Sequence, residues 1–314
     1  MTMVVTTAPA CWGVDDAANP HLPDWRLVLA EAAQAGYGGL ELGPYGYMPL
    51  DAGVLGAALA EHGLHIVAGT IFDDLVDPGN RAAVVAKARE ICALITKLPK
   101  PPVYPGQRFA APYLTVMDWG DRARDYAAGH SGRAVRLPDT DLTGMIETIR
   151  AVAEAAAVFG VRPVVHPHAG GHIEFEDEID RLLAAIPAEL VGLCIDTGHA
   201  KFSGMDPVRV LEKYWDRIDY LHFKDIDQTV YDRIMGERIR FFEACARGVM
   251  CPIGDGVIDY PAIHALLSAR GYAGYITVEQ ERDPRNAAGS LEDVRKSRDY
   301  LKSAGFSDGK EERP

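Results

Sequence analysis

Five short hydrophobic segments of this chain end in imidazole, ammonium or carboxylate side chains. The polar residues at these ends are, in chain order, Glu41; His166 and His168; Asp196 and His199; His222, Lys224 and Asp225; and Glu279 and Glu281. One such group alone is explained as a hydrogen-bonded polar side chain at a strand end. If all five segments end at the same place, however, so many titratable groups would repel one another or lack partners unless a cation lay among them. The residue types therefore indicate a divalent metal site.

Two histidines and two carboxylates provide the expected metal ligands, which we predict to be His166, Asp196, His222 and Glu279. This mixed nitrogen and oxygen set suits Mn²⁺, Co²⁺, Fe²⁺ or Zn²⁺ better than Ca²⁺. We favour Mn²⁺ or Co²⁺, while Zn²⁺, Fe²⁺ and Mg²⁺ stay compatible. Because His166 and His168 are two residues apart on one strand, they face the same side, and either could be the ligand. We choose His166 from the direction of the strand.

The remaining polar groups are candidates for proton transfer and substrate binding. His168 is placed to remove a proton beside a metal-polarised carbonyl, and Lys224 to stabilise an enolate or protonate a leaving hydroxyl. For Lys224 the alternative is an ion pair with Asp225 or Glu281. His199 is expected first to orient a ligand or cap its loop, and second to act directly in catalysis. The candidate substrate-binding residues are Glu41, Asp225 and Glu281.

The segments that must position these groups alternate with stretches of helical periodicity, a pattern typical of repeated βα units with a parallel sheet. The eight predicted strands are Ala10–Val14, Gly39–Leu42, His65–Gly69, Tyr113–Val116, Pro163–His166, Gly192–Ile195, Tyr220–Phe223 and Tyr275–Val278. Helices predicted between them include Trp25–Ala35, Asn80–Lys97, Leu142–Phe159, Glu176–Ala185, Pro207–Trp215 and Tyr260–Ala269. Eight such units predict a closed (β/α)₈ TIM barrel, in which the carboxyl ends of the strands meet on one active-site face.

Two longer segments interrupt this alternation, at residues 98–139 and 227–256. We expect both to be βα loops on the active-site face, where such loops often cover substrates. The alternative is that they form a dimer contact or surface decoration. We predict one barrel domain over residues 1–306 and a polar, flexible tail at 307–314.

The composition excludes several classes of partner. A net charge of -13 and a pI near 5.2 oppose binding to nucleic acid or to an anionic membrane surface. We expect no signal peptide in Met1–Cys11 and find no apolar run of about 18 residues that could span a bilayer. Five cysteines without a Cys-x-x-Cys pair argue against a disulfide framework or a cysteine zinc site and favour the cytoplasm. A homo-oligomer stays open.

Five motifs in the second half of the chain carry a family resemblance. They are His166-x-His168-x-Gly170, Asp196-Thr197-Gly198-His199-Ala200, Arg217-Ile218-x-x-x-His222-Phe223-Lys224-Asp225, Gly254-Asp255-Gly256-x-Ile258-Asp259, and Val278-Glu279-x-Glu281-x-Asp283-Pro284. Through them, residues 163–284 resemble the inosose (2-keto-myo-inositol) dehydratases of the xylose isomerase-like barrel superfamily. The resemblance implies metal ligands on strands five to eight, at the four positions given above. The superfamily usually has glutamate at the first of them, whereas His-x-His resembles the dehydratases themselves.

This resemblance implies a metal-dependent carbon–oxygen lyase that dehydrates a small-molecule keto-polyol such as 2-keto-myo-inositol through an enediolate. The nearest alternative is a sugar isomerase or ketose 3-epimerase, which keeps the enediolate and omits the elimination. Cleavage of a keto-glycoside by the same proton chemistry also stays open. A different class is an inactive sugar-binding subunit on the same scaffold, since fold alone does not prove activity. The complete set of candidate ligands argues against that last class.

Overall fold

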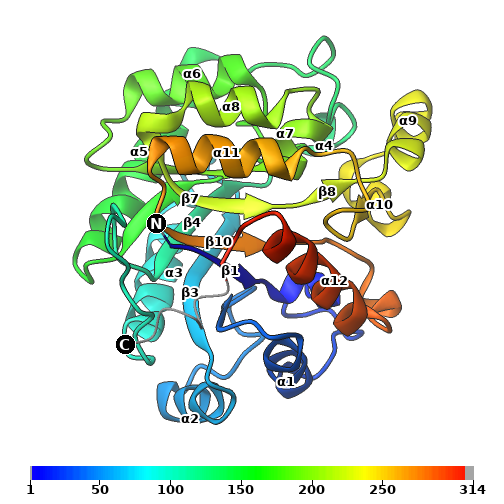
Figure 1. The fold of residues 1–314 in the computed structure, drawn as a ribbon. Helices are drawn as coiled ribbons and strands as arrows, with labels where there is room; N and C mark the ends of the chain where they lie inside the picture. The colour runs from blue at the N-terminus through cyan, green and yellow to red at the C-terminus, as the bar shows by residue number, and fades with distance from the viewer. Residues whose placement is uncertain (1, 308–314) are drawn as a thin grey trace.

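Eight parallel strands close into a barrel in the computed structural model of the protein, which describes residues 2–307 (Figure 1). The strand order around the barrel is β1-β10-β7-β6-β5-β4-β3-β2, and β1 closes the ring by pairing with both β10 and β2. The barrel strands are β1 (Met3–Thr7), β2 (Gly39–Glu41), β3 (His65–Asp73), β4 (Tyr113–Asp118), β5 (Arg162–Val165), β6 (Gly192–Asp196), β7 (Ile218–Phe223) and β10 (Gly274–Val278). The predicted eight-stranded barrel is confirmed.

The first predicted strand is wrong. Residues 10–14 lie in and after a short 3₁₀ helix, η1 (Pro9–Trp12), which starts with proline and ends at Gly13 in the left-handed region, at φ 76°. The first strand is instead β1, whose β-branched Val-Val-Thr-Thr run is fully buried. Ser307 pairs with this strand through hydrogen bonds to Val5 and Met3, so it is not part of a flexible tail. Residues 308–314 of the predicted tail lie outside the described residues.

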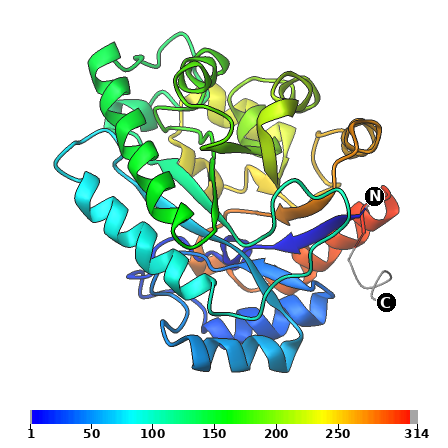
Figure 2. The same ribbon diagram turned by 90° about the vertical axis from the view of Figure 1, so that its left-hand side faces the viewer.

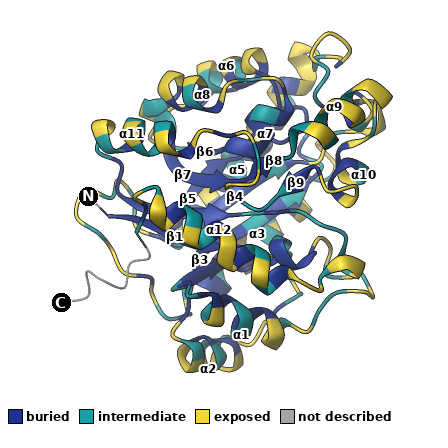
Figure 3. Ribbon diagram, turned by 45° about the vertical axis from the view of Figure 1, so that its right-hand side comes forward, coloured by how far each residue is buried: buried dark blue, intermediate teal, exposed yellow. Residues whose placement is uncertain are grey.

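Helices surround the barrel and turn their apolar sides to it, so that the strands are buried and the outer helix faces exposed (Figure 3). They are α1 (Trp25–Ala35), α2 (Ala52–His62), α3 (Arg81–Ile95), α4 (Arg122–Asp125), α5 (Asp139–Ala157), α6 (Glu176–Ala185), α7 (Thr197–Phe202), α8 (Pro207–Lys213), α9 (Gln228–Glu237), α10 (Phe241–Ala246), α11 (Tyr260–Arg270) and α12 (Ser290–Ser303), with the 3₁₀ turns η2 (Trp215–Arg217) and η3 (Pro284–Asn286). The long helices α3 and α5 lie side by side (Figure 2). Among the described residues, no helix has both the length and the apolar character needed to cross a bilayer.

Local sequence explains where many of these helices begin. An aspartate side chain accepts a hydrogen bond from a backbone N–H of the first turn, which satisfies a donor that the helix itself cannot. Seven of the described helices begin in this way: α1, α2, α4, α7, α8, α9 and α11, after Asp24, Asp51, Asp121, Asp196, Asp206, Asp227 and Asp259. The predicted bounds of α1 and α6 are confirmed residue for residue.

Alternation along the strands decides which side chains enter the barrel. On β7, the Tyr220 hydroxyl and the His222 ring both reach Glu41 on β2 across the interior, whereas Leu221 and Phe223 belong to the outer core under the helices. Successive side chains of a strand face opposite sides, so inward positions recur every second residue. At the carboxyl ends of the strands the inward residues are polar and charged, including His166, Asp196 and His222.

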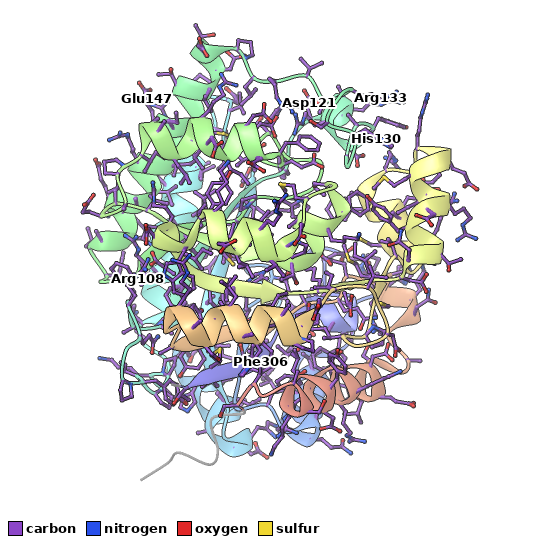
Figure 4. All side chains as sticks on the ribbon, turned by 45° about the horizontal axis from the view of Figure 1, so that its top comes forward. Arg108, Asp121, His130, Arg133, Glu147 and Phe306 are labelled. Carbon is purple, nitrogen blue, oxygen red and sulfur yellow. The ribbon has the colours of Figure 1, made fainter. Side chains whose placement is uncertain are left out.

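The first predicted insert differs from expectation in its placement. Residues 99–111 precede β4 and lie under the amino ends of the strands, where the Tyr275 hydroxyl donates to the Pro102 carbonyl and Arg108 pairs with Asp219. Only the part after β4 lies on the active-site face. Figure 4 shows Arg108 far from Asp121, His130 and Arg133, which belong to that second part. The insert straddles β4 and therefore cannot lie on one face of the barrel.

The second insert does follow β7 and carries structure of its own. Strands β8 (Asp225–Ile226) and β9 (Met250–Cys251) pair antiparallel, and α9 and α10 project beside them at the right of Figure 1. The Asp225 carboxylate, which is buried, organises this segment. Its Oδ1 accepts hydrogen bonds from the backbone N–H groups of Ile226 and Ile258, and its Oδ2 accepts from those of Gly254 and Gly256, at 2.9 to 3.2 Å.

Replacing Asp225 by asparagine should destabilise the fold, because an amide NH₂ would face two backbone N–H donors in place of an oxygen. We expect a loss of about 1.5–3 kcal/mol in the free energy of unfolding, the usual contribution of hydrogen bonds to a charged group. The matched control is Asp255→Asn, which breaks a half-exposed ion pair to Lys296 and should cost less than about 1 kcal/mol. Urea denaturation of both variants measures the difference, and equal losses would contradict this account of Asp225.

The loops after β4 and β5 touch at a glycine. Gly120 has φ +70°, and a Cβ there would lie 2.1 Å from the carbonyl oxygen of Gly170. Gly63, which ends α2 at φ +65°, has nothing within 4 Å of the corresponding Cβ position. The two glycines therefore share a backbone conformation and differ in the space around it.

We expect Gly63→Ala to cost about 1–2 kcal/mol for the left-handed conformation alone. Gly120→Ala should cost at least about 1 kcal/mol more, since the two loops must also separate. Chemical denaturation gives both values. If Gly120→Ala is no more destabilising than Gly63→Ala, the contact between the two loops does not constrain them.

Candidate metal centre and active site

The four predicted metal ligands converge at the carboxyl end of the barrel. His166 follows β5, Asp196 ends β6, His222 lies in β7 and Glu279 follows β10. One donor atom from each of the four lies within 4.8 Å of the others. The His166 Nε2 and Asp196 Oδ2 atoms are 3.5 Å apart, and His222 Nδ1 is 3.1 Å from Glu279 Oε2 and 3.9 Å from Asp196 Oδ2. The strands thus bring the predicted quartet together.

The spacing and hydrogen bonding of this quartet fit a divalent metal. Tetrahedral bonds of about 2.1 Å place neighbouring ligand atoms about 3.4 Å apart, close to the separations above. Among the described residues, neither ring nitrogen of His166 nor Asp196 Oδ2 has a hydrogen-bond partner, although all are buried. Buried polar atoms without partners are costly, and a cation between these atoms would remove that cost.

His166 rather than His168 belongs to the quartet. The ring of His168 lies in a second group of potential donors, with His199 and Glu281. Cys194 also lies within reach of His166 and His222, which sequence reasoning did not anticipate. Burial raises the pKa of the Cys194 thiol to about 12, so the thiol stays protonated near pH 7. A protonated thiol is a poor metal ligand, because the thiolate is the form that binds metal.

Lys224 places its ammonium group beside the quartet. Its Nζ is 2.7 Å from Glu279 Oε2 and 3.2 Å from Asp196 Oδ2, and it donates a short hydrogen bond to Glu281 Oε1. Burial alone lowers the pKa of this amine, but the three carboxylates outweigh it and hold the pKa well above its ordinary value. Lys224 therefore carries a buried positive charge.

A glycine allows this lysine to lie so close to the loop after β6. A Cβ on Gly198 would lie 2.4 Å from the Lys224 Cβ. Of the two ion pairs that the sequence suggested for Lys224, the structure has the one with Glu281. Asp225, the next residue, faces the other side of the strand and is used by the loop described above.

His168 and His199 lie together next to Lys224. Their ring centroids are 4.1 Å apart, and both rings contact Phe241 of α10. Burial, together with the charges of His166 and Lys224, lowers the pKa of His168 to about 3. Burial and the Lys224 charge likewise put the pKa of His199 well below its usual value. Both imidazoles are neutral near pH 7, as a general base must be before it accepts a proton.

Glu41, predicted to bind substrate, is buried beneath the quartet. Its Oε1 accepts hydrogen bonds from His222 Nε2 and from the Tyr220 hydroxyl, each at 2.8 Å. Because Nε2 of His222 is engaged here, the Nδ1 atom is the one that faces the quartet. A carboxylate on the second nitrogen of a ligand histidine fixes the ring and its tautomer. In this structure Glu41 orients His222.

The other two carboxylates predicted for substrate differ in their placement. Glu281 is at the site, where its Oε1 meets Lys224 and its Oε2 is buried without a hydrogen-bond partner among the described residues. Asp225 is not at the site, because four backbone N–H groups of the loop occupy both of its oxygens. The substrate-binding role predicted for Asp225 does not fit this placement, because neighbouring residues along a strand face opposite sides of the sheet and Lys224 faces the site.

Sequence reasoning missed the aromatic wall beside His168. Phe72 at the end of β3 and Phe242 of α10 lie 5.1 and 6.0 Å from the His168 ring, centroid to centroid, and Trp119 packs edge-on against Phe72. The Phe241-Phe242 pair gave no signal because its place depends on how α10 folds back over the barrel.

Sequence reasoning also missed a buried carboxylate that holds the loop after β5. Glu174 accepts hydrogen bonds from the backbone N–H groups of Gly129 and Gly170 and from the Ser203 hydroxyl, at 2.7 to 3.0 Å. Arg124 pairs with Glu174 and with Glu178. Three loops around His168 are thereby tied to one another.

Comparison with known proteins agrees with this architecture. The family model described as "Xylose isomerase-like TIM barrel" matches residues 29–304. Among solved structures, the IOLI protein with a binding zinc atom superposes with a TM-score of 0.70 at 15% identity, over 97% of this chain and all of the other. A D-allulose 3-epimerase from Methylomonas sp. in complex with D-allulose gives a TM-score of 0.68 at 15% identity, over 96% and 97% of the two chains. At such identities these two likenesses concern the fold.

A sequence relative is more specific. The inosose dehydratase of Geobacillus kaustophilus (strain HTA426) is 31% identical over 285 residues, which cover 88% of this chain and 87% of the relative. This agrees with the resemblance carried by the motifs around His166, Asp196, His222 and Glu279. The chain therefore belongs to the xylose isomerase-like TIM barrel family, and is an enzyme homologous to the inosose dehydratases.

Proposed function

We propose that this enzyme is a metal-dependent dehydratase that removes water from a keto-polyol such as 2-keto-myo-inositol. The observation that carries the proposal is a cluster of four potential metal donors, in which neither ring nitrogen of buried His166 has a hydrogen-bond partner among the described residues, directly beside a neutral imidazole and a buried ammonium group. Such a set combines a cation site, a base and a proton donor at one end of the barrel. The inosose dehydratase relatives support the choice of substrate class.

His166, Asp196, His222 and Glu279 would hold the metal, and we propose Mn²⁺ or Co²⁺, with Zn²⁺ as a further candidate. When bound, a divalent ion there would polarise a substrate carbonyl and so acidify the neighbouring C–H. Glu41 keeps the Nδ1 atom of His222 turned to this site.

Side chains of the protein carry out the two proton transfers of the dehydration. His168, neutral and buried, takes the proton from the carbon next to the carbonyl; the electron pair of that C–H bond forms the C=C bond of an enolate, and the carbonyl pair moves to oxygen. The carbonyl then re-forms, the C=C pair shifts to the bond with the next carbon, and the C–O bond there breaks, so that the hydroxyl leaves as water with a proton from the Lys224 ammonium. Phe72, Phe241 and Phe242 contact the His168 ring and shield the base from solvent, which keeps its lone pair free.

A ketose 3-epimerase is the second candidate. The D-allulose 3-epimerase of Methylomonas sp. shares the fold, and removal of the same proton followed by its return on the other face would give epimerisation. Histidine at position 166 favours the dehydratase, because the epimerases of the superfamily resemble the glutamate version of this strand. The two reactions differ in whether the adjacent hydroxyl leaves.

Metal binding tests the quartet directly. We expect wild-type protein to bind about one equivalent of Mn²⁺ or Co²⁺ by titration calorimetry, and His166→Ala to lose affinity by more than about 100-fold, since even second-shell changes cost 10–100-fold. The matched control is His62→Ala at the end of α2, beside the amino end of β3 and so at the end of the barrel opposite to the quartet, which should leave affinity unchanged. Unaltered affinity in His166→Ala would remove this residue from the ligand set.

Turnover tests the substrate. Metal-loaded enzyme should convert 2-keto-myo-inositol to a product that has lost one water, detected by mass spectrometry. His168→Gln should lower kcat by about 10²–10⁴-fold while metal affinity stays the same, because only the base is lost. Deuterium uptake from solvent without loss of water would favour the epimerase, and absence of turnover with Mn²⁺, Co²⁺ or Zn²⁺ would reject this substrate.

A further inference from the structure

A single residue of the loop after β5, Ala169, connects two buried histidines of the site through its backbone N–H and its carbonyl oxygen. The carbonyl oxygen of Ala169 lies 2.9 Å from His168 Nδ1. The backbone N–H of the same residue donates to His199 Nδ1 at 3.1 Å. Both imidazoles are buried. Each histidine thus has its Nδ1 atom engaged by Ala169, but one faces an acceptor and the other a donor.

These two hydrogen bonds require opposite tautomers. A neutral imidazole carries one N–H and one lone pair on its two nitrogens. His168 must hold its hydrogen on Nδ1 to donate to the carbonyl, so its Nε2 has the lone pair. His199 must have the lone pair on Nδ1 to accept from the N–H, so its Nε2 carries the hydrogen.

Lys224 is a competing donor to His199, since its Nζ is 3.0 Å from His199 Nε2. An ammonium group has three hydrogens, and three carboxylates, those of Asp196, Glu279 and Glu281, surround this one. Lys224 therefore does not need His199 as an acceptor. The nearest carboxylate oxygen to His199 Nε2 is Glu281 Oε1, at 3.5 Å, which leaves the Nε2–H available to a substrate oxygen.

The backbone N–H of Ala169 has no alternative acceptor among the described residues. Its acceptor is His199 Nδ1, and a buried N–H without an acceptor costs roughly 1–3 kcal/mol. The tautomer of His199 with hydrogen on Nε2 accepts the Ala169 N–H, whereas the other tautomer leaves that N–H unpaired.

We propose that the backbone N–H and carbonyl of Ala169 give the two histidines different roles, with His168 as the proton acceptor and His199 as a hydrogen-bond donor to a substrate oxygen through Nε2–H. This deepens, and rests on, the dehydratase proposed above. His199 keeps its proton, because losing it would leave an imidazolate anion. The leaving hydroxyl therefore takes its proton from Lys224, and His199 stabilises negative charge on substrate oxygen as a neutral donor.

The same tautomers bear on whether His168, His199 and Glu281 could bind a second metal ion. These three residues form a group with ligand-like spacing, but an Nε2 atom that carries hydrogen has no lone pair for a metal. This group accordingly binds substrate oxygen instead of a second cation. The enzyme should hold one divalent metal per chain.

Nitrogen-15 NMR of histidine-labelled, zinc-loaded full-length enzyme tests the tautomers without substrate. Two-bond correlations from ring protons distinguish protonated from bare ring nitrogens, and His168→Gln and His199→Gln identify the signals. We expect protonated Nδ1 with bare Nε2 in His168, and the reverse in His199, while exposed His21 shows averaged signals. The same tautomer in both histidines would overturn the proposal.

Two further measurements separate this inference from the proposed substrate. Metal analysis should give one zinc per chain, and two would overturn it. Glutamine places an N–H donor near the position of Nε2 and asparagine does not, so His199→Gln should stay within about tenfold of wild-type kcat, while His199→Asn should lose about 10²–10³-fold, as for loss of an oxyanion donor. Equal losses would contradict the donor assignment. Opposite tautomers without turnover of 2-keto-myo-inositol would reject that substrate and leave the histidine assignment standing.

Discussion

The buried charges at the carboxyl end of the barrel constrain everything around them. Asp196, Glu279 and Glu281 surround the ammonium group of Lys224, and Glu41 lies beneath them against His222. Removing charged groups from water is costly unless opposite charges and hydrogen bonds replace the solvent. One lysine balances part of this negative charge, and the donor atoms of His166, Asp196, His222 and Glu279 lie close enough together for a divalent cation to balance more.

The barrel makes this arrangement attainable. Inward positions recur every second residue, so Tyr220, His222 and Lys224 of one strand stack from the interior to the rim. The absence of a side chain on Gly198 lets the loop after β6 approach Lys224. The loops that bound the site are in turn fixed by buried carboxylates, Asp225 on one side and Glu174 on the other. These two residues do no chemistry in our account, yet they place the residues that do.

The strand ends could be read from the sequence because hydrophobic runs and their terminal polar residues are local signals. His166, Asp196, His222 and Glu279 were found in this way. Asp225 was misplaced because adjacency in sequence was taken for adjacency in space, which strand alternation forbids. The first strand was misplaced because the buried Val-Val-Thr-Thr run of β1 lies so near the amino end of the chain.

The placement of other segments depends on tertiary structure. Residues 99–138 are divided between the two ends of the barrel because part of the segment precedes β4 and part follows it. The position of Phe241 depends on long-range packing of α10. The proposed tautomers of His168 and His199 could not be predicted from the sequence, because the spacing of the residues does not show that the backbone of Ala169 contacts both rings.

The central claim is that one divalent metal is held by His166, Asp196, His222 and Glu279. Anomalous diffraction from crystals of the manganese-loaded enzyme tests it most directly, because it locates the ion independently of any activity. Our account predicts one anomalous peak per chain, within bonding distance of His166 Nε2, Asp196 Oδ2, His222 Nδ1 and Glu279 Oε2. A peak among His168, His199 and Glu281, or none at the quartet, would contradict it.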